Sequence, residues 1–430
     1  MRPQYFVRGD VLGLRFERTS FFFRSFPLKK KAVTLYVLTD SGIENQAIDV
    51  FFLDGYGDVP FINISDSLDV LQRSLSDSTV ATSDKTVTIG RSENSATIAF
   101  DFANKTVHYS DLDLYASNHH KTSVLDLASD QGETDEGKKK YLATQNIEYY
   151  RTGNSLSFDL SHWSIPMYFE NGAGYLPVQT FADLVLFERN IYLAFNGQNL
   201  FMSGSWSNDM DDLFYSAPTG DRSEDLAKFS YNELTLALDF QYGLKEDHDI
   251  TDFTTYLPQV SGLKDRLLST NALEADKGVY QLCSQAFSDF HSYLQATSSY
   301  AGKDALDSAK DATLRSPNFT EYQLIRYAFS TARTAVIKAI SGGTKTAFDP
   351  YEEYSNGDGT TTAFVTFDNF TMPNQDYYTT PATASAADTY GILEYAHSQI
   401  FKSGSTVKNV VLDLSCNSGG SINASVYTLG

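Results

Sequence analysis

The chain has 430 residues, of which 42% are hydrophobic and 14% aromatic, and its formal net charge is −21. This composition indicates a folded protein of roughly two to four domains. The negative charge argues against nucleic acid or an anionic membrane surface as a partner. No run reaches about 18 consecutive apolar residues, so no transmembrane segment is expected. The two cysteines, Cys283 and Cys416, form no CxxC pair, and the sequence predicts neither a metal site nor a cofactor.

The first 31 residues differ in charge from the rest of the chain. They hold eight basic side chains against two acidic ones, a balance of +6, so the remaining 399 residues carry −27. Arg24 interrupts the apolar run, and the segment therefore lacks the core of a signal peptide. We expect residues 1–31 to be a poorly ordered basic lead-in; a basic tail that binds an anionic partner is the alternative.

Residues 32–228 have the pattern of a β-rich region, with short runs of Val, Ile, Thr, Tyr and Phe between turn residues. Within it, residues 51–68 align without gaps to residues 168–185, at an offset of 117. The shared positions are two glycines, a proline and an aspartate: Gly55 and Gly172, Gly57 and Gly174, Pro60 and Pro177, Asp66 and Asp183. The sequence therefore predicts two related modules, 32–115 and 143–228, joined by a mobile charged loop at 116–142.

Residues 229–345 have the pattern of a helical subdomain. The segment 231–244 alternates Leu234, Leu236 and Leu238 like a strand, although its Leu, Ala and Glu content favours a helix. Helices are also expected in "SGLKDRLLS", in "EADKGVYQLCSQAFSDFHSYL" and at 320–340. In the last of these, Thr320 with Gln323 predicts a capped start, and we expect one apolar face to be buried: Leu324, Tyr327, Ala328, Ala332, Val336 and Ile340.

Residues 346–430 alternate strand and helix, which is typical of an α/β unit. We expect a strand at 361–370, a helix at 385–404, a strand at 407–414, and a helix starting in "INASVYTLG". The second strand is apolar at consecutive positions, which predicts burial on both faces of a parallel sheet. The predicted fold class is thus multidomain α+β: a β-rich N-terminal half, a helical subdomain and an α/β unit.

The turn "SCNSGG" follows that second strand. Two glycines before a helix can leave backbone N–H groups open to an approaching anion, and Asp413 and Asn417 can hold the turn by bonding its backbone. Such a turn suits a phosphate, a carboxylate or the oxyanion of an acyl-transfer intermediate. A small-anion binder therefore remains one interpretation.

The segment "NVVLDLSCNSGGSINAS" resembles the hydrophobic-Asp-hydrophobic-X-X-Asn-X-Gly-Gly motif of the C-terminal processing (tail-specific) and tricorn-type serine peptidases. "LTLALDFQYGL", "FSDFHSYL" and "TAFVTFDNF" resemble further segments of that family in the same order, over roughly residues 230–430. The similarity of "LTLALDFQYGL" favours a helix for the ambiguous segment 231–244. The two β-rich modules resemble domains of the copper-amine-oxidase N-terminal type found in bacterial surface proteins.

The resemblance implies a serine endopeptidase with an incomplete, crotonase-like α/β domain at 346–430. It implies backbone oxyanion donors at Gly419 and Gly420, and His291 as general base with Asp289 in support, although Phe290 replaces the family's usual glycine. The nucleophilic serine is expected beyond residue 430, with the chain itself inactive, and a serine–lysine mechanism remains open. We expect a peptide or protein substrate and a bacterial extracellular or cell-surface location. The alternative is a noncatalytic surface protein whose β-rich modules hold a glycan or protein partner.

Overall fold

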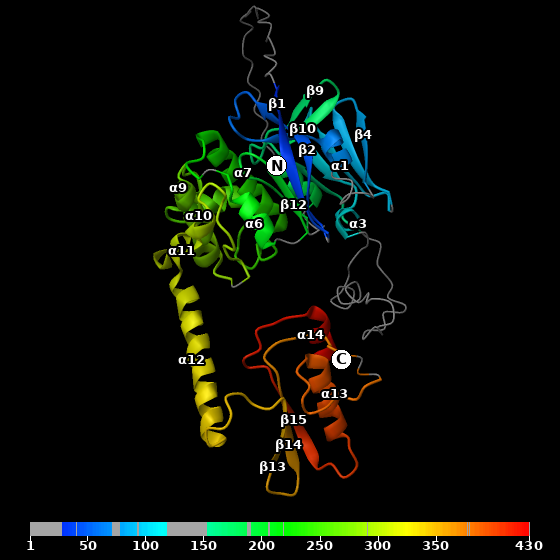
Figure 1. Ribbon diagram of the computed structural model, residues 1–430, viewed down its shortest axis with the longest axis vertical. Coiled ribbons are helices and arrows are strands. Elements are labelled where there is room, and N and C mark those ends of the chain that lie inside the picture. Colours follow the sequence, from blue (N-terminus) through cyan, green and yellow to red (C-terminus); the bar gives the residue numbers. More distant parts are fainter. Residues whose placement is uncertain are drawn as a thin grey trace, which may run out of the picture.

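The computed structural model describes residues 28–39, 41–70, 78–92, 94–117, 153–186, 191–204, 207–217, 219–289, 291–375, 377 and 379–429. The described chain is a mixed α+β protein with three sheets. Figure 1 shows a β-rich and helical body joined by one long helix to a smaller α/β body. Residues 1–27 of the basic lead-in and residues 118–142 of the expected mobile loop lie outside the described residues.

The largest sheet has seven strands in the order β11-β12-β1-β2-β3-β10-β9. Their bounds are β1 (Leu28–Thr39), β2 (Gly42–Leu53), β3 (Phe61–Asn63), β9 (Tyr168–Glu170), β10 (Ala173–Pro177), β11 (Tyr192–Phe195) and β12 (Leu200–Ser203). Strands of both predicted modules pair directly, because β3 runs antiparallel to β10 and β1 runs parallel to β12. One hydrophobic cluster extends from Val33 to Leu236. The two modules therefore share a sheet and a core.

A second sheet is fully antiparallel, in the order β4-β5-β6-β7-β8. Its strands are β4 (Ser78–Ser83), β5 (Thr86–Arg91), β6 (Thr97–Asp101), β7 (Thr106–Tyr109) and β8 (Leu156–Asp159). Alternate residues of β5 and β6 are buried in the shared core. The sheets meet closely at Gly174 of β10, where an added Cβ would lie 2.5 Å from the Phe102 ring. Helix α3 (Leu112–Ser117) follows β7.

The repeated segments 51–68 and 168–185 have the same order of elements. The first contains the end of β2, a glycine turn, β3 and the start of α1 (Ile64–Val70). The second contains β9, a turn with Gly172 at φ 80°, β10, and α5 (Val178–Phe181), which continues as a π-helical turn, η1 (Ala182–Leu186). At an offset of 117, residue 178 corresponds to residue 61, so the second helix starts three residues earlier than the first (64 minus 61). The order recurs, and the strand-to-helix boundary shifts.

The helical subdomain packs beside the sheet (Figure 1). Its α-helices are α6 (Asn208–Phe214), α7 (Glu224–Gln241), α8 (Phe253–Tyr256), α9 (Leu263–Leu267), α10 (Ala272–Gln281) and α11 (Leu306–Ala309). Short 3₁₀ or π turns accompany them: η3 (Leu257–Gln259), η4 (Leu282–Phe287), η5 (Lys303–Ala305) and η6 (Ala312–Leu314). Most of the ambiguous segment 231–244 lies in α7, which confirms the helix. Leu236 of α7 packs in the β-rich core and Tyr231 in the helical one, so α7 joins the two regions across the expected boundary at 228/229.

The helix expected through "FSDFHSYL" ends early. It stops at Phe287, and Ser288 has a left-handed φ of 52°. The Asp289 side chain then accepts hydrogen bonds from the amides of His291 and Ser292. Side-chain bonds of this kind compete with helical ones, so the prediction that the helix continues past His291 was wrong.

Helix α12 (Pro317–Ile340) crosses between the two bodies (Figure 1). Its N-cap is Ser316, whose Oγ accepts from the Phe319 amide, with Pro317 in the first turn. Thr320 was therefore the wrong cap, since Ser-Pro is the stronger start signal. The apolar face was expected to be buried, yet Leu324 is 62% exposed and Tyr327 74%. That prediction was also wrong. Ile337 is the one buried residue of α12, which spans the space between the two bodies.

The α/β body has the expected strand-helix-strand order. It contains β13 (Tyr351–Ser355), β14 (Thr361–Thr366), α13 (Thr389–Ile400), β15 (Val407–Asp413) and α14 (Ile422–Leu429). Strands β14 and β15 are parallel, and Ile392 and Ala396 of α13 pack against one face of the sheet. Burial of β15 on both faces was a wrong prediction: Val410 is 53% exposed, because the hydrophobic cluster around α13 includes β14 and, among the described residues, none of β15. Among the described helices, none is both long and apolar enough to cross a membrane.

Candidate active site

The glycine turn at 415–421 is bonded to the segment that follows β14. Asn417 Nδ2 donates to the Phe367 carbonyl at 3.2 Å, and the Ser418 amide donates to the Asp368 carbonyl at 2.9 Å. The Phe370 amide donates to the Gly419 carbonyl, and the Ser421 amide donates to the Phe370 carbonyl, each at 2.8 Å. The turn is thus held against the sheet on both sides of its glycines.

The two glycines differ in what their amides do. Gly419 N–H donates to Asn417 Oδ1 at 2.8 Å, so that donor is engaged. Gly420 is exposed, and its N–H has no hydrogen-bond partner among the described residues. Its φ of 137° and the close Phe370 carbonyl leave no room for a Cβ. Helix α14 begins two residues later, so the free donor lies near the positive end of a helix.

Asp413, at the end of β15, is part of an ion-pair network that sequence reasoning missed. Its Oδ1 accepts from the Ser415 amide at 3.0 Å, and its Oδ2 lies 3.7 Å from Arg333 Nη2. Arg333 of α12 also donates to Asp368 at 2.9 Å. Burial favours a raised pKa for Asp413, but the Ser415 bonds and the Arg333 charge outweigh it and lower the pKa. The network attaches α12 to the glycine turn.

Asp289 and His291 lie in the loop after η4. The Asp289 carboxylate accepts from the Tyr242 hydroxyl at 2.8 Å, from the Ser292 amide at 2.6 Å and from the His291 amide at 2.8 Å. Burial acts to raise the pKa of Asp289, but the bonds from Ser292 and Tyr242 lower it overall. Asp289 therefore holds the backbone of the loop, and the His291 side chain is exposed. Phe290 lies outside the described residues.

The structure brings the predicted site residues together in two groups. Asp413, Asn417, Gly419 and Gly420 form the turn, whereas the loop of His291 belongs to the helical subdomain. Among the described residues, none of the hydrogen bonds or ion pairs joins this loop to the turn. Figure 1 shows α12 running between the two bodies that carry them.

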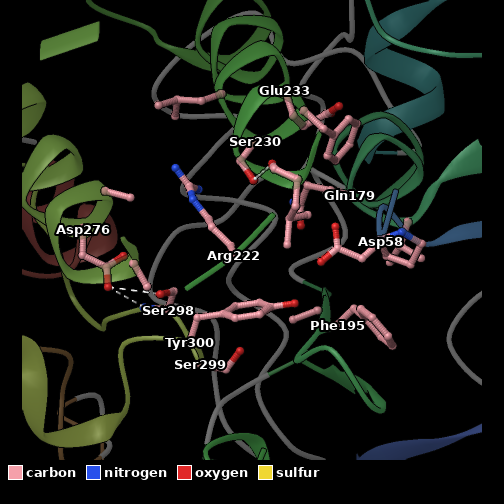
Figure 2. Close-up of a pocket in the computed structure, with 18 of the residues that line it drawn as sticks. Asp58, Gln179, Phe195, Arg222, Ser230, Glu233, Asp276, Ser298, Ser299 and Tyr300 are labelled. Atoms are coloured by element: carbon pink, nitrogen blue, oxygen red, sulfur yellow. Dashed lines mark hydrogen bonds between the residues drawn. The ribbon is translucent and has the colours of Figure 1, made fainter. Parts of the chain in front are cut away.

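A cavity of about 510 Å³ lies between the β-rich region and the helical subdomain (Figure 2). Its polar lining residues are Asp58, Gln179, Asp183, Arg222, Ser230, Glu233, Asp276, Ser298, Ser299 and Tyr300. These residues come from several distant segments, and the sequence singled out one of them, Asp183, through the repeat. The cavity shares no residue with the predicted peptidase site.

A third cluster has the residue types of a metal site. Ligand atoms of His162, Asp239 and Asp252 lie within 4.8 Å of one another. However, Asp239 already accepts from Lys245 Nζ at 2.7 Å, from Trp163 Nε1 at 2.9 Å and from the Phe253 amide. The lysine ammonium is the counter-ion of this carboxylate, and we assign no metal there.

Comparisons of this chain with protein-family models, with curated proteins and with solved structures found no match.

Proposed function

We propose that the protein is a serine peptidase of the C-terminal processing or tricorn type, in which the crotonase-like α/β body supplies an oxyanion donor. The observation that carries this proposal is the exposed Gly420 amide, which has no hydrogen-bond partner in the described part of the chain and lies after a parallel strand and before a helix. A backbone donor in this position suits the negative charge that develops on a scissile carbonyl oxygen.

The resemblance implied two donors, Gly419 and Gly420, and our proposal keeps one of them. The Gly419 N–H donates to Asn417 Oδ1, whereas the Gly420 N–H has no partner among the described residues. In this proposal Asn417 and Asp413 position the turn. The nucleophilic serine would come from a later part of the peptidase domain, as the resemblance implies, and we propose that a second donor does so too.

His291 remains our proposed general base. Histidine titrates near neutrality and can accept a serine proton, and the loop of Asp289 presents the imidazole to solvent. Its role requires the helical subdomain to approach the α/β body, since no described hydrogen bond or ion pair joins the two groups. Substrates would be peptides or unfolded protein segments outside the cell or at its surface.

The test is Gly420→Ala in the protein extended past residue 430, assayed with an unfolded protein substrate. Alanine keeps the backbone N–H, but its Cβ would collide with the Phe370 carbonyl and displace the amide. A displaced oxyanion donor should lower kcat on the order of 100-fold or more, with little change in KM. Gly404→Ala is the matched control, because Gly404 also has a left-handed φ, 81°, in the same body, but open space around it.

Because Gly420→Ala can also distort the turn, a second measurement avoids the substitution. A peptide boronic acid, which mimics the tetrahedral intermediate, should shift the Gly420 amide resonance downfield in the wild-type protein. An unshifted resonance, or equal loss of activity in both glycine variants, would contradict the proposal.

A further inference from the structure

The cavity of Figure 2 has the size of a small-molecule site, about 510 Å³. One wall comes from the β-rich region, through Asp58, Asp183 and Phe195. The opposite walls come from α7 and α10, and from the loop that carries Ser298 and Tyr300. A ligand bound here would therefore contact both regions of the larger body.

A buried pair of carboxyl groups lines one end of the cavity. Glu233 of α7 is only 3% exposed; its Oε2 accepts from Thr180 Oγ1 at 2.5 Å, while its Oε1 is buried without a partner. Asp183 of η1 lines the same space and accepts from Gln179 Nε2 at 2.9 Å. An unpaired buried carboxyl oxygen is costly, so a ligand that donates a hydrogen bond to Glu233 Oε1 would be favoured here.

Both carboxyl groups are harder to ionise than usual. Burial, and then the charge of Asp183, raise the pKa of Glu233 well above its usual value. Burial also raises the pKa of Asp183, to about 6. A cation bound beside the two groups would favour their ionised forms.

Acidic side chains outnumber basic ones in the rest of the lining as well. Arg222 donates through Nε and Nη2 to the carbonyls of Ser269 and Leu267. Asp276 accepts from the Ser298 amide and hydroxyl, as drawn in Figure 2, and Asp58, on the opposite side, accepts from Ser223. The charged side chains of the lining are thus four carboxyl groups (Asp58, Asp183, Glu233 and Asp276) and one guanidinium, Arg222.

We propose that this cavity binds a small organic cation, with an ammonium group at Asp183 and Glu233 and an apolar or aromatic body against the neighbouring walls. The ammonium supplies the donor that Glu233 Oε1 lacks, and Phe195, Phe214 and Phe229 supply apolar contact. The excess of carboxyl groups over cationic side chains disfavours an anion, and these apolar walls suit an organic body better than a hydrated metal ion. The inference is independent of the peptidase proposal, since the cavity contains neither His291 nor the glycine turn.

The experiment is calorimetric titration of the protein at pH 7 with phenethylamine, with 2-phenylethanol and with 3-phenylpropionate. We expect the amine to bind and the neutral and anionic analogues to bind at least tenfold more weakly. Titrations of the amine in buffers of different ionisation enthalpy should show proton release, because a bound cation lowers the raised pKa values of Glu233 and Asp183. Equal binding of the alcohol and the amine, or no binding of the amine at millimolar concentration, would overturn the proposal.

Two variants locate the site. Asp183→Asn and Glu233→Gln should each weaken amine binding at least tenfold, and Glu233→Gln should also reduce proton release, a readout that a purely structural role would not move. Asp66→Asn is the matched control: Asp66 occupies the position equivalent to Asp183 in the other repeat, is exposed, and pairs with Asn63 away from the cavity. Unchanged binding in both cavity variants, each checked for cooperative unfolding, would refute the assignment.

Discussion

The burial of Asp276 determines how strongly this carboxyl group should make the stability of the protein depend on pH. This carboxyl group on α10 is only 7% exposed. Burial raises its pKa from 3.8 to about 6, although bonds from Ser298 and the charge of Arg222 act in the opposite direction. As the pH rises, the unfolded chain therefore loses this proton before the folded protein does. The stabilising contribution of the protonated group is complete below about pH 4 and is lost as the pH approaches 6.

The magnitude is the pKa difference, about 6 minus 3.8, multiplied by about 1.36 kcal/mol per unit, which gives about 3 kcal/mol. Asp276→Asn removes the titration, while the asparagine carbonyl can still accept from the Ser298 amide and hydroxyl. Between pH 4 and pH 7, the free energy of unfolding should therefore fall about 3 kcal/mol more in the wild type than in the variant.

Urea unfolding at four pH values between 4 and 7, followed by circular dichroism, measures this difference. Asp311→Asn is the control of opposite sign, because hydrogen bonds from Thr313 lower the pKa of Asp311. That variant should lose stability relative to the wild type as the pH rises. Parallel curves for the wild type and Asp276→Asn would refute the reasoning about burial.

Two further predictions concern α12. Arg333→Leu should destabilise the α/β body by about 1–3 kcal/mol and speed proteolysis at the glycine turn, because Asp368 and Asp413 lose their shared partner. The control is Arg326→Leu, which removes an exposed arginine of the same helix that contacts the Tyr322 ring. Equal effects of the two substitutions would contradict the role of the ion-pair network. Leu324→Ser and Tyr327→Ser should each change the free energy of unfolding by less than about 0.5 kcal/mol, because these side chains are already exposed. If urea unfolding shows a stability loss above about 2 kcal/mol, this face of the helix is packed against another part of the protein.

Local signals in the sequence predicted much of the fold, because they depend on neighbouring residues. The strand-helix-strand order of residues 361–413 follows from periodicity and from Gly404, which follows the helix. The glycine turn was found in the same way, since Asn417, Gly419 and Gly420 act within a few residues of one another.

Other features depend on tertiary contacts that one sequence does not display. An apolar strand has the same sequence pattern whether or not other elements cover it. The exposure of β15 could therefore not be predicted from its sequence. Ser316 and Thr320 are both good N-caps, and Pro317 decides between them. The cavity was missed because Asp183, Glu233 and Asp276 come from three separate elements.

Active-site labelling tests whether this chain forms part of a serine peptidase, as we propose. The protein extended past residue 430 would be treated with a fluorophosphonate, and the modified residue identified by mass spectrometry. We expect modification of one serine after residue 430, slowed on the order of a thousandfold by His291→Ala and unchanged by His397→Ala, which removes an exposed histidine of α13. Absence of labelling, or equal labelling in the wild type and His291→Ala, would show that the proposed function is wrong.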